Sequence, residues 1–88
     1  MPEYKILYAD TAVSEDIPAL PTKFKATIKK AIDERLTTNP IAYGKPLRYS
    51  LKGHRRLRVS DYRIVYRIDE ETLTIFISAI KHRKDVYE

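Results

Sequence analysis

The sequence contains no cysteine, and this absence excludes several kinds of site at once. The chain can form no disulfide framework, offers no thiolate ligand to a metal and has no thiol nucleophile. Long hydrophobic runs are missing as well, since no apolar stretch approaches the roughly 20 residues that span a bilayer. The opening MPEYKILY lacks the basic-then-apolar pattern of a signal peptide. We therefore expect a soluble, cytoplasmic protein with no membrane association.

The common catalytic motifs are also missing. The sequence has no histidine pair at metal-ligand spacing, no acidic cluster for magnesium, no glycine-rich phosphate loop and no Ser-His-Asp set. His54 follows Lys52 and Gly53 in an expected turn, and we interpret it as a plain surface residue. The sequence therefore predicts no metal and no cofactor, and a metal-dependent nuclease is disfavoured.

What is present favours one small α+β domain over residues 1–88. YKILYA at 4–9 predicts an opening strand, and AVSEDIPAL predicts a short helix that is bent or broken at Pro18. KFKATIKKAIDERLTT predicts a second helix with Thr22 as its candidate cap. Spacings of three and four place one apolar stripe on this helix, which we interpret as its core face: Phe24, Ile28, Ala31, Ile32 and Leu36.

The second half of the chain reads as strands. A loop at 39–46 precedes LRVS at 57–60, an alternating run at 61–69 and a nearly continuous apolar run at 72–80. Asp69 to Thr72 form the expected hairpin turn. The predicted fold is thus an N-terminal strand, a two-helix hairpin and an antiparallel β-meander of three or four strands, with the helices on one face.

The positive charge is concentrated in the second half. Residues 1–44 carry six Lys or Arg and six Asp or Glu, whereas residues 45–88 carry eleven and six. Between 45 and 68 there are eight basic residues and a single acid, Asp61. Such a field favours a polyanion or an acidic protein as partner.

Strand alternation sorts these arginines by face. Leu57, Val59, Tyr62, Ile64 and Tyr66 are expected to build the core, because they share the apolar side of two neighbouring strands. The opposite, open side then collects four arginines: Arg56, Arg58, Arg63 and Arg67. Guanidinium groups bind phosphate oxygens through paired hydrogen bonds, so we expect an anion to complete this surface.

The register of the last strand decides which tail residue joins the arginines. If Ile68 pairs with Leu73, Arg63 lies roughly opposite Ser78 and His82 falls on the arginine face, with Lys81 on the other. A shift of one residue or a β-bulge reverses this. The sequence leaves both arrangements open.

Positively charged side chains can support the cleavage of RNA without a metal ion, because RNA carries its own nucleophile in the 2′-hydroxyl. A protein can then act by positioning the strand, stabilising the phosphorane and moving a proton. Arginine cannot be the base near neutral pH, because its pKa exceeds about 12. The candidates for proton transfer are His82, Lys81 and Tyr87. Tyr87 is also a candidate for stacking on a base or for anchoring the chain end on the sheet.

The segment KPLRYSLKGHRRLRVSDYRIVYRID, followed by a strand and AIKHRKDVY, resembles the RelE/ParE superfamily of bacterial toxins, on the RelE side. The resemblance covers nearly the whole chain, and R-x-R-V-x-DYR-x-x-Y together with HRKDVY is its specific part. It implies an endoribonuclease, an mRNA interferase, that cuts messenger RNA in the ribosomal A site without metal and leaves a 2′,3′-cyclic phosphate. It also implies translation inhibition, an acidic RelB-like antitoxin, and operator DNA bound through that antitoxin.

The resemblance assigns roles residue by residue. Arg63 matches the family's phosphate-stabilising arginine, Arg56 and Arg58 match a basic strand pair, and Tyr87 matches a functional C-terminal tyrosine. His82 is favoured for acid–base work. The other basic side chains are assigned to RNA or phosphate contact: Lys45, Arg48, Lys52, Arg55, Arg67, Lys81 and Arg83. Two alternatives stay open: a ParE-like poison of DNA gyrase without nuclease activity, and a relic whose basic face only binds antitoxin or RNA.

Overall fold

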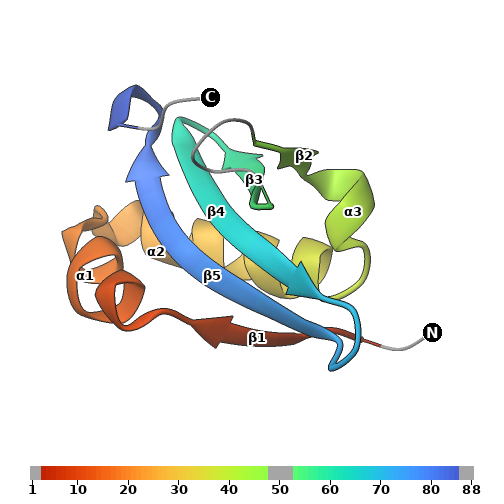
Figure 1. The fold of residues 1–88 in the computed structure, drawn as a ribbon. Helices are drawn as coiled ribbons and strands as arrows, with labels where there is room; N and C mark the ends of the chain where they lie inside the picture. The colour runs from red at the N-terminus through yellow and green to blue at the C-terminus, as the bar shows by residue number, and fades with distance from the viewer. Residues whose placement is uncertain (1–2, 48–52, 86–88) are drawn as a thin grey trace.

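The computed structural model describes residues 3–47 and 53–85, and it has the expected α+β architecture. The strands are β1 (Lys5–Tyr8), β2 (Lys45–Pro46), β3 (Arg55–Val59), β4 (Tyr62–Asp69) and β5 (Thr74–His82). The helical elements are η1 (Ala12–Asp16), α1 (Ile17–Ala19), α2 (Thr22–Ala31), η2 (Ile32–Leu36), α3 (Pro40–Tyr43) and η4 (Arg83–Asp85). Figure 1 shows α2 running behind the sheet, so that the other face of the sheet is turned to the viewer.

The strands form one five-stranded sheet in the order β1-β5-β4-β3-β2. The predicted antiparallel meander is confirmed in β3, β4 and β5, each paired with the next. The opening strand was not placed by the prediction. It lies parallel to β5 at the edge of the sheet, with Ile6 opposite Ile75 and Tyr8 opposite Ile77. This position lets the apolar side chains of β1 pack against the helix side of the sheet.

The apolar stripe of the long helix is confirmed as its core face. Ile28, Ala31, Ile32 and Leu36 are buried, and Phe24 packs partly buried against the same cluster. The sheet contributes the alternating residues that were expected to face the helices: Leu57, Val59, Ile64 and Tyr66, with Tyr62 at the margin. Burial of this continuous apolar surface is the main source of the domain's stability.

Three local predictions need correction. Thr22 is not the N-cap of α2. Pro21 occupies that position and makes no side-chain capping hydrogen bond, and Thr22 is the first residue of the helix. The expected loop at 39–46 contains the short helix α3, whose cap is Asn39: its side chain accepts a hydrogen bond from Ala42 N at 3.2 Å. Pro18 lies in the first turn of α1, directly after η1. Proline is tolerated in that turn. The helix is short, as predicted, but it is not broken at Pro18, because Asp16 and Ile17 keep helical backbone angles and the helical run ends with Ala19.

Tyr66 and Gly44 fit together closely beneath the sheet. The Tyr66 hydroxyl donates to the carbonyl of Pro40, and its ring is fully buried. A Cβ added to Gly44 would lie 1.8 Å from that hydroxyl oxygen and 2.7 Å from the ring carbon Cζ. These contacts fix the path of the chain from α3 into β2.

We expect Gly44→Ala to lower the free energy of unfolding by about 1–3 kcal/mol, because the added methyl group overpacks a filled site. Chemical denaturation of the purified variant measures this change. An unfolding free energy within about 0.5 kcal/mol of the parent would show that Tyr66 moves aside without cost.

Candidate RNA-binding and catalytic site

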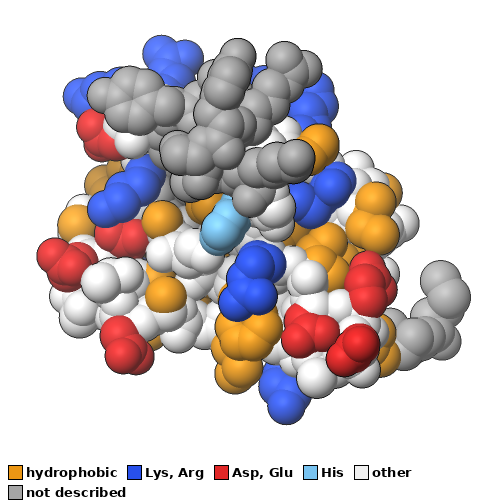
Figure 2. All heavy atoms as spheres, viewed as in Figure 1, with side chains coloured by type: hydrophobic (Ala, Val, Ile, Leu, Met, Phe, Trp, Pro, Cys, Tyr) orange, Lys and Arg blue, Asp and Glu red, His pale blue; other side chains and the backbone are white. Residues whose placement is uncertain are grey.

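The arginine face predicted from alternation is present. In the register of β3 and β4, Arg58 lies directly opposite Arg63, and Arg56 lies opposite Val65. Leu57 and Ile64 form the intervening pair, which faces the helices. Lys45 of β2 pairs with Arg56 and so extends the same face. Figure 2, in the view of Figure 1, shows Lys and Arg side chains around the upper part of this face and near its middle.

Arg63 is buried, contrary to the prediction that it lies on an open face. Only 7% of the residue is exposed, whereas Arg58 across from it is exposed. The Nη1 of Arg63 donates to the carbonyls of Ser60 at 3.4 Å and Tyr62 at 3.2 Å. Ser60 has a φ of 55°, which makes the β3–β4 turn tight and brings these carbonyls within reach. The guanidinium is therefore held in place by the turn.

Arg55 and Arg67 are placed away from this pair. Arg55 donates from Nη2 to the carbonyls of Ile41 at 2.8 Å and Gly44 at 2.9 Å, and thus ties β3 to α3. Arg67, farther along β4, stacks over the ring of Phe76 with 4.7 Å between its Cζ and the ring centroid. The structure accordingly gives Arg55 a structural role and leaves Arg67 at the far end of the face.

The register of β5 resolves the choice between Lys81 and His82. Ile68 pairs with Ile75 and not with Leu73, and an irregularity between Val65 and Tyr66 leaves one extra residue in β5. As a result Arg63 pairs with Lys81, and His82 pairs with Tyr62. The arrangement that puts His82 on the arginine face is therefore wrong, because the bulge reverses the alternation beyond it.

Lys81 is engaged by Asp16, a residue that the sequence did not single out. The Nζ of Lys81 lies 2.6 Å from Asp16 Oδ1, and Asp16 Oδ2 accepts the backbone N–H of Ile80 at 3.0 Å. β1 pairs with β5 only as far as Ile77, so Asp16 supplies an acceptor at the free edge that follows. The hydrogen bond from Lys81 to Asp16 raises the pKa of Lys81, which keeps this amine protonated.

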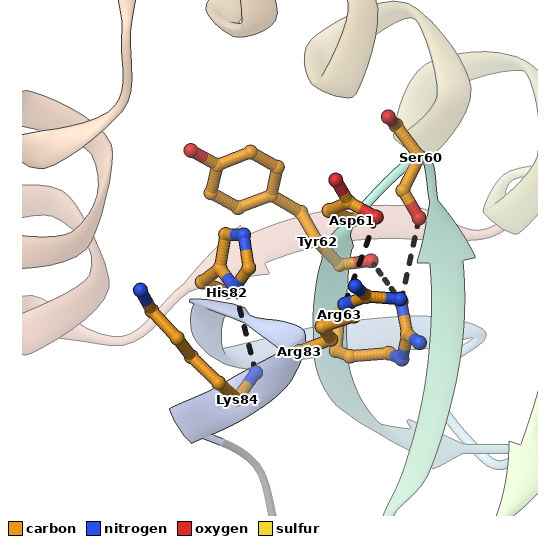
Figure 3. Close-up of polar contacts among 7 residues, drawn as sticks. All are labelled: Ser60, Asp61, Tyr62, Arg63, His82, Arg83 and Lys84. Carbon is orange, nitrogen blue, oxygen red and sulfur yellow. Dashed lines mark hydrogen bonds and ion pairs between the residues drawn. The ribbon is translucent and has the colours of Figure 1, made fainter.

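His82 lies at the end of β5 on the helix side. Its ring contacts that of Tyr62 edge to face, with 5.4 Å between centroids, and its Nδ1 accepts the backbone N–H of Lys84 at 3.4 Å. This bond favours the tautomer that carries the proton on Nε2. Figure 3 shows the two rings together and the Arg63 guanidinium turned away from them.

The C-terminal turn η4 closes over the end of the β3–β4 hairpin. Arg83 N donates to the carbonyl of Asp61 at 2.7 Å, and Arg83 Nε lies 3.8 Å from the Asp61 carboxylate. Both side chains of this ion pair are exposed, so it contributes little stability. Arg83 thereby lies beside Arg63 at the end of the arginine face (Figure 3).

Three predicted site residues fall outside the described part of the chain: Arg48, Lys52 and Tyr87. His54 is half-buried, which is less exposed than the predicted surface residue. Residues 3–47 and 53–85 contain no group of three or more His, Asp or Glu side chains placed to share a metal ion. Over the same residues, no helix has the length and apolar character that a membrane span requires.

Comparison with known proteins decides the family. Residues 3–87 match the family model described as the ParE toxin of the type II toxin–antitoxin system parDE. This chain belongs to the ParE toxin family. Two curated relatives from Mycobacterium tuberculosis, Toxin RelG and Toxin RelE, are each 36% identical to the toxin over 84 residues. Each match covers 96% of this chain, and the shares of the relatives are 95% and 86%.

Solved structures agree with this assignment. The toxin–antitoxin complex RelBE2 from M. tuberculosis contains a chain 35% identical to this toxin, with a TM-score of 0.86 over 94% of this chain and 100% of that one. The isolated RelE toxin of E. coli matches with a TM-score of 0.73 at 21% identity, over 90% of this chain and 83% of that one. The match to E. coli RelE shows that the two chains share a fold. The protein is a type II toxin of the RelE/ParE superfamily, close to RelE and RelG.

Proposed function

We propose that this toxin is a ribosome-dependent endoribonuclease that cuts messenger RNA in the A site without a metal ion and so inhibits translation. The observation that carries the proposal is the facing pair of Arg58 and Arg63. Side chains directly opposite in antiparallel strands have Cβ atoms about 4.5–5.5 Å apart, and like charges at that distance are destabilising. A phosphate between the two would remove the repulsion and accept hydrogen bonds from both.

The two arginines are suited to different tasks. Arg63 is held by the turn carbonyls, so its charge is already oriented before RNA arrives. Arg58 is exposed and able to follow the phosphate as its geometry changes. Preorganised cations of this kind act most strongly on the dianionic phosphorane that forms in the transition state. Arg56 and Lys45, next on the same face, would contact neighbouring phosphates.

His82 is our candidate for proton transfer. Lys81 is protonated through its bond to Asp16, and the arginines cannot act as bases, whereas the Nε2 of His82 is left for the substrate. In the proposed step, His82 gives up the long 3.4 Å bond from Lys84 N and carries its ring proton on Nδ1, so that Nε2 becomes a proton acceptor. Nε2 then takes the proton of the 2′-hydroxyl, O2′ attacks phosphorus, and the bond from phosphorus to the 5′-oxygen breaks. The 5′-oxygen leaves with a proton from an acid, for which Tyr87 is the candidate. The products are a 2′,3′-cyclic phosphate and a 5′-hydroxyl.

The proposed protein partner is an acidic, RelB-like antitoxin, and operator DNA would be bound through that antitoxin. The related RelBE2 chain is part of a toxin–antitoxin complex, and so are RelE chains from E. coli and Methanococcus jannaschii. An apolar groove of about 300 Å³ lies between η1–α1 and α2, with Ile17, Ile28 and Ile32 in its walls and Lys25 and Lys29 beside it. An amphipathic segment with acidic flanks fits this combination.

We expect antitoxin binding to weaken by about tenfold or more when salt rises from about 0.1 to 0.5 M, because surface charge pairs are screened over that range. Titration calorimetry or surface plasmon resonance with the purified antitoxin at several salt concentrations measures it. A complex with unchanged affinity would assign the binding energy to the apolar groove.

A ParE-like gyrase poison is the second candidate, because the matching family model is described by that toxin. The deciding experiment adds the protein to in vitro translation of a defined message and maps the 3′ ends, beside a gyrase supercoiling assay. Cuts within codons on ribosome-bound message, absent from naked RNA, support the nuclease. Intact message with blocked supercoiling would replace it with the gyrase poison, and no effect in either assay would indicate a non-catalytic relic.

A further inference from the structure

A second, polar cavity lies where α1 meets the end of β5. Its volume is about 240 Å³. Leu20 and Ile80 provide apolar walls, and Tyr62 and His82 provide the two rings that touch edge to face. Asp16 of η1 and Asp85 of η4 add two carboxylates, and the remaining lining residues are Ala19 and Lys81.

We propose that this cavity binds a nucleobase of the RNA whose phosphate lies on the arginine face, and that it prefers guanine. The proposal rests on the proposed nuclease function, which by itself requires only phosphate contacts and a proton-transfer group. The cavity would add a choice of base made by the toxin itself.

The lining suits a planar, amphipathic ring. Flat apolar and aromatic walls offer stacking and van der Waals contact to any base, which is sequence-tolerant. The two carboxylates at the cavity would select between bases, since an ionised carboxylate only accepts hydrogen bonds. Guanine presents N1–H and N2–H₂ side by side, and a carboxylate can accept both. Uracil offers one N–H flanked by two carbonyl oxygens, which a carboxylate repels.

Asp85 is the carboxylate best placed to choose. Asp16 is buried and already bonded to Ile80 N and Lys81 Nζ, whereas Asp85 is exposed at the mouth of the cavity. Asp16 keeps Lys81 beside the base, where the charge of the ammonium offsets that of the two acids. Asp85 is therefore the residue that we expect to determine base specificity, whereas Asp16 keeps Ile80 and Lys81 in position in the cavity wall.

The cavity and the arginine face meet at the end of the sheet. Tyr62 pairs with His82, and the next pair along the ladder is Arg63 with Lys81. Successive residues of a strand point to opposite faces, so the base would lie on the helix side and the phosphate on the arginine side. The ribose would cross the strand end between them, which brings its 2′-hydroxyl near His82. The exposed Asp61–Arg83 pair at this place is weak enough to yield.

Binding can be measured without the ribosome. The four nucleoside 3′-monophosphates and inorganic phosphate are titrated into ¹⁵N- and ¹³C-labelled protein, with NMR shifts followed for Tyr62, His82 and Asp85 and, separately, for Arg56 and Arg58. We expect the first group to shift with guanosine monophosphate, which binds about tenfold more tightly than uridine monophosphate. Inorganic phosphate should shift only the second group. Equal affinity for all four nucleotides, or no shift at the cavity, would overturn the proposal.

Two test variants and one control variant locate the binding site. Ala19 lines the cavity on its exposed side, so Ala19→Phe should fill the cavity and lower the affinity for guanosine monophosphate about tenfold or more. Ala26→Phe, on the exposed side of α2, is the control and should leave that affinity unchanged. Asp85→Asn replaces a carboxylate, which only accepts hydrogen bonds, by a carboxamide, which both donates and accepts them. This variant should lose the preference for guanine while it still binds nucleotides. Unchanged preference in Asp85→Asn would overturn the assigned role, whatever the fold of Ala19→Phe.

The cleavage assay separates this proposal from the function on which it rests. If the parent protein cuts ribosome-bound message and Asp85→Asn cuts it with an altered base preference, both stand. If the parent protein cuts nothing, the nuclease fails and the NMR titration still decides the cavity. If Asp85→Asn and Ala19→Phe cut with the parent's base preference, the nuclease stands and the base site is wrong.

Discussion

Replacing Arg63 with alanine is expected to lower cleavage of ribosome-bound message by about 10²–10³-fold, the usual loss when one preorganised donor to a developing anion is removed. Arg63 combines a buried position with bonds to the carbonyls of Ser60 and Tyr62, so no neighbour can move into its place. The rate is measured by primer extension on a defined message in reconstituted translation. The toxin concentration is held above saturation so that binding losses do not enter.

The burial of Arg63 makes controls necessary, because its removal also breaks its hydrogen bonds to two carbonyls. Arg63→Met retains the volume without the charge, and Arg63→Lys retains the charge without the planar fork. Arg67→Ala is the matched control, since Arg67 lies on the same face of β4 but stacks on Phe76 at the far end. We expect Arg67→Ala to cut within about threefold of the parent. Folded Arg63→Met with near-parental cleavage would exclude Arg63 from catalysis.

Asp16→Ala is expected to lower the free energy of unfolding by about 2–3 kcal/mol, in line with the loss of hydrogen bonds to a charged, buried group. Asp16 is 6% exposed, and its carboxylate joins η1 to the free edge of β5 through Ile80 N and Lys81 Nζ. For a domain of this size the melting temperature should fall by about 10–20 °C. Thermal and chemical unfolding measure both quantities.

The ion pair also gives this prediction a pH dependence. Because the pKa of Lys81 is raised in the folded protein, its contribution is present below the ordinary lysine value of 10.5 and is lost as the pH rises through the raised pKa. The stability difference between parent and Asp16→Ala should therefore shrink in alkaline solution. Asp33→Ala is the control, since the Lys29–Asp33 pair has the same 2.6 Å distance but is exposed. If the two variants lose equal stability, burial of Asp16 is irrelevant to its role.

The elements that the sequence predicted correctly are those with strong periodicity. The helical stripe of Ile28, Ile32 and Leu36 and the alternation of Leu57 and Val59 each leave only one side to bury. The same alternation placed Arg56, Arg58 and Arg63 on one face. Short-range pattern was sufficient there because the two strands are joined by a tight turn, which leaves little freedom in their register.

The features that were missed depend on contacts between distant parts of the chain. The bulge in β5 carries no local signal in an apolar run, yet it exchanges the faces of Lys81 and His82. Asp16 reads as an ordinary helix residue, and its importance follows only from the free edge of β5, some 64 positions away. The parallel pairing of β1 likewise follows from packing between the chain's beginning and its last strand. The cavity beside His82 combines both kinds of distant contact.

In the proposed reaction the substrate's own 2′-hydroxyl is the nucleophile, and no metal is needed at the cut. The most direct measurement compares two ribosome-bound messages that differ only at the nucleotide 5′ to the cleavage site, with either a 2′-hydroxyl or a 2′-O-methyl group. We expect the toxin to cut the first message rapidly, with a 2′,3′-cyclic phosphate at the new 3′ end, and not to cut the second at that site. Equal cutting of both messages would show that water, and not the 2′-hydroxyl, attacks the phosphate.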